Sequence, residues 1–193
     1  MKLAYLAFAA CALVACDKPA PSGGAAPPAA TPSATPLAPS TAAPIVVTST
    51  SFAADGPIPA TFSCDGRGVM PALSWTAPPP STGAQALVVE DPDAPSGLFT
   101  HLIAWNMGAD ARSIGEGSSP ATVGGALGKN DFGKPGWGGP CPPKGKAHHY
   151  RFRVLALDAP LPSLKAGADR AAFDAAVKGH VLAEGALVGT FQR

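Results

Sequence analysis

The sequence has few charged residues, and neither sign is in excess. Charged side chains make up 14% of the 193 residues, and the formal net charge is +1. Over residues 45–193, twelve Lys and Arg balance twelve Asp and Glu. Proteins that hold nucleic acid or an anionic membrane over a broad surface usually carry a basic excess. We therefore expect no nucleic-acid partner, and any anion must be bound by a local site.

Three common catalytic motifs are also absent. The sequence has no G-x-S-x-G turn, no P-loop and no H-E-x-x-H helix. An enzyme is still an alternative, because two Asp and two His could hold a metal, or Cys141 beside His148 could act as a thiol nucleophile. The spacing of these residues matches no recognisable metal motif, so we expect no catalysis, no metal and no cofactor.

The apolar run at the N-terminus is too short to cross a bilayer. Ala4–Ala15 follows the single cation Lys2 and has the length of a signal-peptide core. It leads into Cys16 through Leu-Val-Ala, which looks like the cleavage motif of bacterial lipoproteins. We predict a signal peptide over 1–15 and lipidation of Cys16, with an ordinary secretory signal as the alternative. An anchor of two or more acyl chains gives stable membrane attachment.

The residues after Cys16 suggest a location and a linker. Asp17 looks like the signal that keeps enteric lipoproteins in the inner membrane, facing the periplasm; the outer membrane is the alternative. From Asp17 to Pro44 only Asp17, Lys18 and Leu37 depart from Ala, Pro, Ser, Thr and Gly. Such a segment has almost nothing to bury, which predicts a disordered linker over 16–44 and one domain over 45–193.

The cysteines of the domain form a single pair. Cys11 would leave with the signal peptide and Cys16 would carry lipid, which leaves Cys64 and Cys141 in an oxidising compartment. We predict a disulfide between them. The alternative is two reduced, partly buried thiols.

The domain is predicted to be mainly β, with antiparallel strands. One helix is indicated over 169–183, where Phe173, Val177 and Val181 recur at helical spacing. No alternation of strands and helices appears, which favours a sandwich or barrel-like fold. The long loop 115–145 is rich in Gly and Pro and should be ordered. Short runs of strand character between Gly, Pro and Asp are Ile45–Thr48, Ala72–Trp75, Ala86–Val89, Leu98–Asn106, Tyr150–Leu157 and Leu187–Phe191.

Two polar features adjoin these strands. Asp91 and Asp93 follow an apolar strand and are stiffened by prolines, although a solvated turn would have the same composition. His101 lies in an apolar strand, and alternation would place Phe99, His101, Ile103 and Trp105 on one face. A buried histidine needs a hydrogen-bond partner, and one of the two Asp is a natural candidate.

A third feature joins a stiff loop to a polar strand. The loop contains Gly139 and Pro140, whose bare backbone suits close approach by a small anion. On the strand that follows, His148 and Tyr150 point to one side and His149 to the other. A structural turn with a polar strand start is the alternative. Carboxylates that orient imidazoles, together with a tyrosine hydroxyl and backbone N–H groups, would form a selective anion pocket.

These segments, in this order, resemble the phosphatidylethanolamine-binding protein family, also called Raf kinase inhibitor-like proteins, and above all its bacterial branch. The resemblance covers residues 47–193 and implies a two-sheet antiparallel β fold with a small helical addition near the C-terminus. It also implies one pocket for a small anion. The motifs that carry it are Asp91-Pro92-Asp93-Ala94-Pro95, the His101 strand, Gly139-Pro140-Cys141-Pro142-Pro143, His148-His149-Tyr150, Cys64-Asp65-Gly66, Asn130-Asp131-Phe132-Gly133 and Gly189-Thr190-Phe191. Carried over by position, the ligand-binding residues are Asp91, Asp93, His101, Gly139, Pro140, His148 and Tyr150.

The sequence departs from the family pattern at two places. Leu102 stands where many relatives carry an aromatic residue, which predicts a less stacked pocket wall. His149 replaces a commoner Arg and should face away from the pocket. His180, on the predicted helix, is a further candidate neighbour, although a helix-surface position is the simpler interpretation.

The resemblance and the residues together favour a binding function. The expected ligand is a small anionic or phosphorylated group, such as a phospholipid headgroup. The alternative is a protein-interaction module that inhibits a kinase or protease by surface docking, with a partner in the envelope. A domain outside the cytoplasm makes a cytosolic kinase a poor candidate, and an exposed apolar patch at the pocket mouth would favour the interaction function.

Overall fold

The structure is a computed structural model that describes residues 44–193. The predicted signal peptide, the predicted lipidation site Cys16 and all of the predicted linker except Pro44 lie outside the described residues. Within the described range no helix has both the length and the apolar character needed to cross a membrane.

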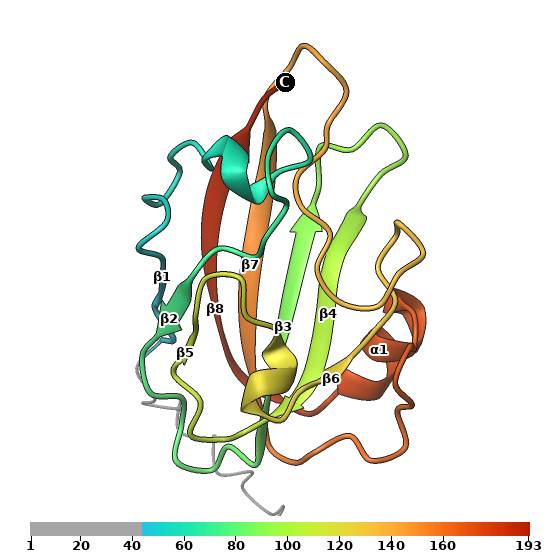
Figure 1. The fold of residues 1–193 in the computed structure, drawn as a ribbon. Coiled ribbons are helices and arrows are strands. Elements are labelled where there is room, and N and C mark those ends of the chain that lie inside the picture. Colours follow the sequence, from blue (N-terminus) through green and yellow to red (C-terminus); the bar gives the residue numbers. More distant parts are fainter. Residues whose placement is uncertain (1–43) are drawn as a thin grey trace, which may run out of the picture. The chain divides into compact units, whose positions relative to one another are not determined.

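The described chain forms two antiparallel sheets and one α-helix (Figure 1). The smaller sheet has the order β1-β2-β5, and the larger sheet has the order β6-β4-β3-β7-β8. This confirms the prediction of a mainly β, two-sheet fold with a helix near the C-terminus. The strands are β1 (Val47–Thr48), β2 (Leu73–Trp75), β3 (Ala84–Asp91), β4 (Phe99–Met107), β5 (Ser113–Ile114), β6 (Ala126–Leu127), β7 (His148–Leu157) and β8 (Val181–Phe191); the helices are α1 (Arg170–Val177) and the 3-10 turns η1 (Ala60–Phe62) and η2 (Pro120–Val123).

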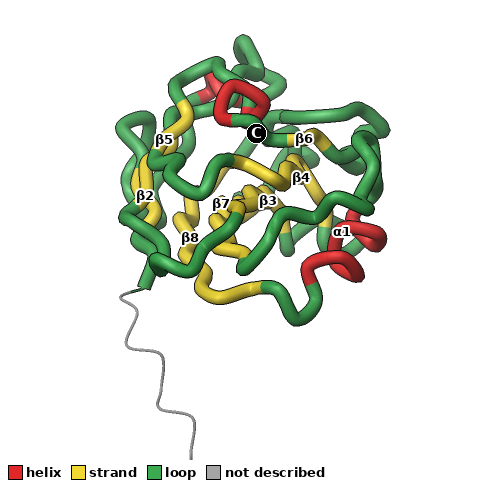
Figure 2. Tube along the Cα trace, turned by 90° about the horizontal axis from the view of Figure 1, so that it is seen from below, coloured by secondary structure: helices red, strands yellow, loops and turns green. Residues whose placement is uncertain are grey.

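The larger sheet is covered on both faces. Seen end-on in Figure 2, β2 and β5 lie on one side of it and α1 on the other. The main core fills the space between the sheets, with Trp75, Leu87 and Phe152 among its members. A second cluster joins the opposite face to Phe173 and Val177 of α1. Every residue of β3 is buried for this reason, and its middle, Ala86–Val89, is a continuous apolar run rather than an alternating one.

The predicted helix was too long. α1 ends at Val177, and Gly179 turns the chain with a positive φ of 85°. Val181 and the residues after it pair with β7 as the start of β8. A glycine just after the last helical turn is a common stop signal, because it adopts the left-handed conformation without a side-chain clash. Val181 therefore belongs to a strand, and its helical spacing from Val177 is coincidental.

The predicted face of β4 was also wrong in part. The pairing of β3 with β4 passes from Val89–Leu102 to Glu90–Thr100, which leaves His101 as an extra residue in a β-bulge. The bulge turns His101 to the same side as Leu102, toward the main core. Ile103 lies on the opposite face, in the cluster under α1. Phe99 and His101 thus do not share a face with Ile103 and Trp105.

The disulfide prediction is confirmed. Cys64 and Cys141 are bridged, with their Cα atoms 5.3 Å apart, and the bond closes a separation of 77 residues. It joins the loop after η1 to the segment that precedes β7.

Candidate ligand pocket

Three strand termini meet at one end of the larger sheet. β3 ends at Asp91, while its antiparallel neighbours β4 and β7 begin at Phe99 and His148. Asp91 pairs with Phe99, and the β3–β7 register continued by one residue sets it opposite Tyr150. Segments that are far apart in the sequence therefore bring polar side chains to one place.

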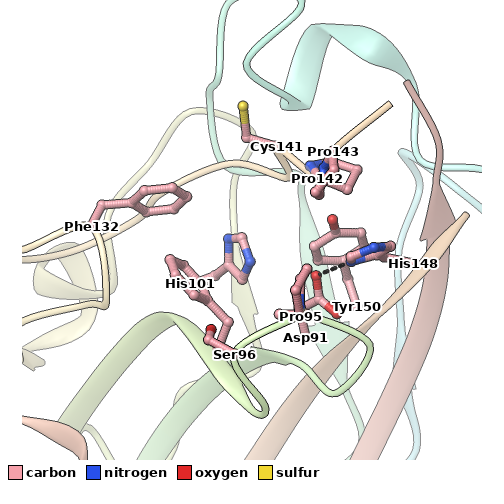
Figure 3. Close-up of a pocket in the computed structure, with 12 residues that line it drawn as sticks. Asp91, Pro95, Ser96, His101, Phe132, Cys141, Pro142, Pro143, His148 and Tyr150 are labelled. Atoms are coloured by element: carbon pink, nitrogen blue, oxygen red, sulfur yellow. Dashed lines mark hydrogen bonds and ion pairs between the residues drawn. The ribbon is translucent and has the colours of Figure 1, made fainter. Parts of the chain in front are cut away.

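A cavity of about 310 Å³ opens at this end (Figure 3). Its polar groups come mainly from the strand termini, and its apolar groups come mainly from the loops between them. The lining residues are Asp91, Ala94, Pro95, Ser96, Phe99, His101, Phe132, Cys141, Pro142, Pro143, His148 and Tyr150.

Asp91 and His148 form a buried pair in the cavity wall. Nδ1 of His148 lies 2.8 Å from Oδ2 of Asp91, and both side chains are almost fully buried. Because a carboxylate only accepts hydrogen bonds, Nδ1 carries the proton and Nε2 is left to face a ligand. The other Asp91 oxygen accepts the backbone N–H of Asp93 at 2.8 Å, which fixes the turn after β3.

His101 is held by the backbone and by aromatic rings. Its Nδ1 donates to the carbonyl of Gly138 at 2.6 Å, so Nε2 is again the nitrogen left for a ligand. The rings of Phe99, Phe132 and Tyr150 lie 5.1–5.4 Å from the imidazole centre. Burial lowers the pKa of His101 below its usual value, so the free protein carries this ring neutral at pH 7.

Tyr150 provides the third polar group. The residue is fully buried, and its hydroxyl has no hydrogen-bond partner among the described residues. Burial, and next the Asp91 carboxylate, raise the pKa of Tyr150 well above its usual value. The hydroxyl therefore keeps its proton and can act as a hydrogen-bond donor. An unsatisfied buried donor is costly, so its presence in a cavity wall needs an explanation.

Of the seven ligand-binding residues that the family resemblance implies, four lie in the cavity wall: Asp91, His101, His148 and Tyr150. Asp93 lies beside the cavity and accepts both the backbone N–H and Nδ1 of His149. These bonds lower the pKa of Asp93. His149 points away from the cavity, as alternation along β7 predicts.

Gly139 and Pro140 lie behind the wall. A Cβ added to Gly139 would approach the carbonyl oxygen of Phe62 to 2.4 Å, so only glycine allows this close packing of two backbones. Pro140 is buried and its carbonyl accepts the N–H of Cys64 at 3.0 Å. Gly139 lines a second cavity of about 270 Å³, which shares Phe132 and Cys141 with the first.

His180 is remote from the cavity. It follows α1 and bonds to Asp158, beyond the far end of β7 from His148. Leu102 is likewise outside the cavity, because it packs in the main core. The aromatic contact in the cavity wall is an edge-to-face pair of Phe99 and Phe132, whose ring centroids are 4.8 Å apart.

Sequence reasoning missed the apolar half of the wall. Phe132 is carried by a loop that the buried side chain of Asn130 shapes: its Oδ1 accepts the N–H groups of Phe132 and Lys134, and its Nδ2 donates to the carbonyl of Gly136. Asn130 and Phe132 stood in a motif of the resemblance, but only the fold brings that loop to His101. No strand pattern could have indicated this contact.

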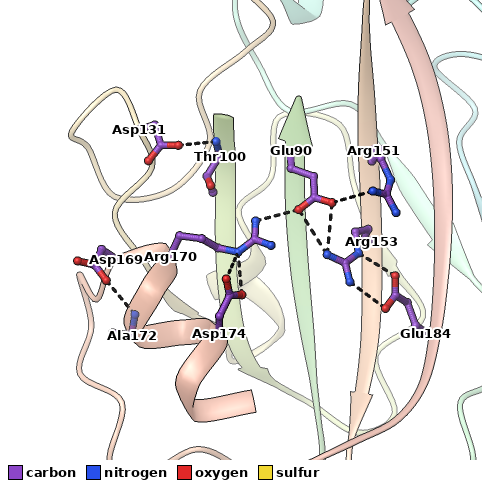
Figure 4. Close-up of polar contacts among 10 residues, drawn as sticks. All are labelled: Glu90, Thr100, Asp131, Arg151, Arg153, Asp169, Arg170, Ala172, Asp174 and Glu184. Atoms are coloured by element: carbon purple, nitrogen blue, oxygen red, sulfur yellow. Dashed lines mark hydrogen bonds and ion pairs between the residues drawn. The ribbon is translucent and has the colours of Figure 1, made fainter. Parts of the chain in front are cut away.

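The opposite face of β3 carries a charged cluster (Figure 4). Glu90, directly before Asp91, is almost fully buried and meets three arginines: Arg151 and Arg153 at 3.3 Å and Arg170 of α1 at 2.8 Å. Glu184 also pairs with Arg153, and the hydrogen bond lowers the pKa of Glu184. The cluster ties β3, β7, β8 and α1 together just behind the cavity.

The cavity contains no cluster of metal-ligand type. Within residues 44–193 no three His, Cys, Asp or Glu side chains lie close enough together to hold an ion. The ionisable groups in the cavity wall are two imidazoles, a phenol and a paired carboxylate.

The fold and the cavity together define a class: a two-sheet antiparallel β protein with one polar cavity at the strand ends of its larger sheet. Residues 48–192 match the family profile described as phosphatidylethanolamine-binding protein. The chain belongs to this family.

Relatives and solved structures agree with this assignment. A UPF0098 protein of Pyrococcus horikoshii is 41% identical over 143 residues, which cover 70% of this chain and 71% of that protein. A Mycobacterium tuberculosis protein named as an expected lipoprotein, LppC, is 40% identical over 152 residues, covering 78% and 74%. The crystal structure of a phosphatidylethanolamine-binding protein homologue from Chlamydia trachomatis superposes with a TM-score of 0.72 at 34% identity, over 78% of this chain and 98% of that one. YbcL of E. coli gives the same TM-score at 28% identity, over 78% and 99%.

Proposed function

We propose that this protein is an exported, lipid-anchored binding protein whose cavity takes a small anionic or phosphorylated group, such as a phospholipid headgroup, without turnover. The observation that carries the proposal is the unpartnered, fully buried hydroxyl of Tyr150 beside two imidazoles with free Nε2 atoms. Three hydrogen-bonding atoms from three strand positions converge on one small space. A tetrahedral oxyanion can satisfy several such groups at once.

The charges of the cavity are consistent with a bound anion only if a proton taken up by His101 or carried by the ligand is included. The two oxygens of the Asp91 carboxyl group are already bonded to His148 and to the backbone of Asp93. His101 is neutral in the free protein and would take up a proton when an anion approaches its Nε2. The proposed ligand therefore binds together with a proton, or carries one itself.

Export and anchoring are proposed from the sequence before residue 44. The Cys16 motif and the relative named as an expected lipoprotein support an anchor at Cys16. Asp17 supports retention in the inner membrane, on its periplasmic side.

Titration of the full-length, detergent-solubilised protein tests the binding function. Phosphorylethanolamine, inorganic phosphate and acetate are added while the amide and imidazole NMR signals are followed. We expect saturable shifts at His101, His148, Tyr150 and the Gly139 loop. His148→Gln should abolish them, and the matched control His180→Gln should not, because His180 also pairs with a carboxylate but lies far from the cavity. No shifts at millimolar ligand would reject the proposal for these ligands.

One observation favours the alternative of a protein-interaction module. Phe132, which lines the cavity, and Leu98, which directly precedes the lining residue Phe99, are large apolar side chains that are 44% and 50% exposed. An envelope protein that docks there would contact both. Loss of a captured partner in Leu98→Ser, with small-anion binding unchanged, would support docking as a separate function.

A further inference from the structure

The Cys64–Cys141 disulfide lies at the surface, between the two cavities. Both cysteines are exposed. Cys141 lines both cavities, whereas Cys64 lines only the second. Figure 3 shows the Cys141 side chain at the rim, with its sulfur directed away from His148 and Tyr150. A small thiol can therefore reach this bond without unfolding of the core.

The two sulfurs differ in their electrostatic surroundings. Nη1 of Arg193 lies 3.8 Å from Sγ of Cys141, while its Nε bonds to Asp65 at 3.0 Å. Among the contacts of the described residues, no cation lies at the sulfur of Cys64. A neighbouring guanidinium stabilises a thiolate, and a stabilised thiolate is the better leaving group in disulfide exchange.

The second cavity offers a route to the other sulfur. Cys64 lines it together with Gly68, Trp137 and Lys134. Lys134 brings a positively charged residue to the lining of this cavity, and a positive charge attracts an incoming thiolate. The second cavity thus gives a thiolate access to Cys64, and Arg193 favours departure at Cys141.

We propose that Cys64–Cys141 is a thiol–disulfide exchange site that reacts with a dithiol by attack at Cys64. The thiolate of the dithiol forms a bond to Sγ of Cys64, the Cys64–Cys141 bond breaks, and its electron pair leaves on Cys141 beside Arg193. The second thiol of the dithiol then loses its proton and displaces Cys64 as a thiolate. The two protons given up by the dithiol end on Cys64 and Cys141, so the protein gains two electrons and two protons and the dithiol is oxidised to a disulfide. This proposal does not depend on which ligand the cavity binds.

The Cys64–Cys141 disulfide also connects thiol–disulfide exchange to the structure of the cavity wall. It pins the segment 138–143, which holds His101 through the Gly138 carbonyl, to the loop after η1. Non-covalent contacts between these loops include the hydrogen bond from Cys64 N–H to the Pro140 carbonyl and the packing of Gly139 on Phe62. Reduction removes the only covalent tie in this part of the described chain.

The direction of attack is tested with a monothiol. The oxidised full-length protein is exposed briefly to 2-mercaptoethanol under native conditions, quenched with iodoacetamide and mapped by peptide mass spectrometry. We expect the mercaptoethanol adduct on Cys64 and the alkyl group on Cys141. The reverse pattern would overturn the direction, and reaction only after denaturation would overturn the exchange site.

The role of Arg193 is tested by the rate of reduction. Dithiothreitol should reduce the disulfide of Arg193→Gln more slowly than that of the parent protein, by a factor of roughly three or more, because the leaving thiol becomes less acidic. Arg67→Gln is the matched control, since it removes the same charge from the loop that carries Cys64 without touching a sulfur. Equal slowing of both variants would point to general attraction of the reagent and would overturn leaving-group stabilisation by Arg193.

Discussion

At the scale of single residues, the Tyr150 hydroxyl is the group that most needs a partner. It is buried in the main core, yet no described residue accepts or donates a hydrogen bond to it. A buried hydroxyl that lacks any partner typically costs about 1–3 kcal/mol, so a ligand that bonds to it gains from the contact. Such a cost is expected at binding sites, where local rules are broken for function.

The Tyr150→Phe variant distinguishes the effect of the hydroxyl on ligand binding from its effect on the stability of the free protein. Removing only the hydroxyl should weaken phosphate binding about tenfold, the value of one hydrogen bond to a charged ligand. The thermal stability of the free protein should stay equal or rise, because an unsatisfied donor is lost. Calorimetric titration and thermal unfolding measure the two effects. Unchanged affinity would show that the hydroxyl does not contact the ligand.

His101 makes the site dependent on pH. Burial lowers its pKa in the folded protein, whereas the unfolded chain has an ordinary value near 6.5. Below about pH 7 the unfolded chain thus binds more protons, so this residue lowers the stability of the free protein as the pH falls. A bound anion opposes the effect, because it favours the charged ring. Asp91, His148 and Tyr150 face the same cavity and modulate it.

We therefore expect sulfate, whose charge is constant over this range, to bind more tightly at pH 5.5 than at pH 7.5 and with proton uptake. Calorimetry in two buffers of different ionisation enthalpy measures the protons taken up. His101→Gln should remove the part of the proton uptake that His101 contributes. Affinity that is independent of pH in the parent protein would contradict the role assigned to His101.

At the scale of elements, the cavity depends on how firmly the end of β3 is held. Glu90 and Asp91 are adjacent and point to opposite faces, so the charged cluster behind the sheet fixes the strand that carries the cavity carboxylate. The arginines that meet Glu90 keep part of their side chains in water. The cluster is thus screened more than a fully buried one.

Glu90→Gln should lower the free energy of unfolding by about 2 kcal/mol, because three arginines then face a neutral amide. Asp174→Asn is the control: it breaks an exposed pair with Arg170 on the same helix and should cost less than about 0.5 kcal/mol. Urea unfolding of both variants measures the difference. Equal effects would mean that burial of Glu90 does not strengthen its ion pairs.

What the sequence could and could not predict follows from these elements. Alternation along β7 correctly separated His148 and Tyr150 from His149, because that strand is regular there. The same rule failed on β4, because the extra residue at His101 leaves no mark in composition or spacing. Phe132 could not be assigned to the wall either, since its position depends on a loop shaped by Asn130 and on tertiary packing. Local patterns thus identified the strands and most polar groups, and missed what the bulge and the loops determine.

At the scale of the whole molecule, the chain enters the domain away from the cavity. Ile45 packs closely against Gly185 of β8, six residues before Phe191, which pairs with His148 at the cavity end. At about 3.3 Å per residue the entry point is roughly 20 Å from the site. In the described chain the start of the domain therefore leaves the cavity mouth open to a soluble ligand.

The proposed anchor makes a prediction about location. In an enteric host, the purified protein should begin at a Cys16 that carries two or three acyl chains, as mass spectrometry of its N-terminal peptide would show, and should fractionate with the inner membrane. Asp17→Ser should move it to the outer membrane, because the residue after the lipidated cysteine is the proposed sorting signal. Lys18→Ser is the control and should leave the location unchanged.

Cys16→Ser should remove the lipid and release the processed chain from both membranes, since the attachment energy comes from the acyl chains. A Cys16→Ser protein that stays membrane-bound after cleavage of residues 1–15 would require another anchor. Parent protein found in the outer membrane with Asp17 intact would refute the sorting role of Asp17 and leave the anchor itself standing.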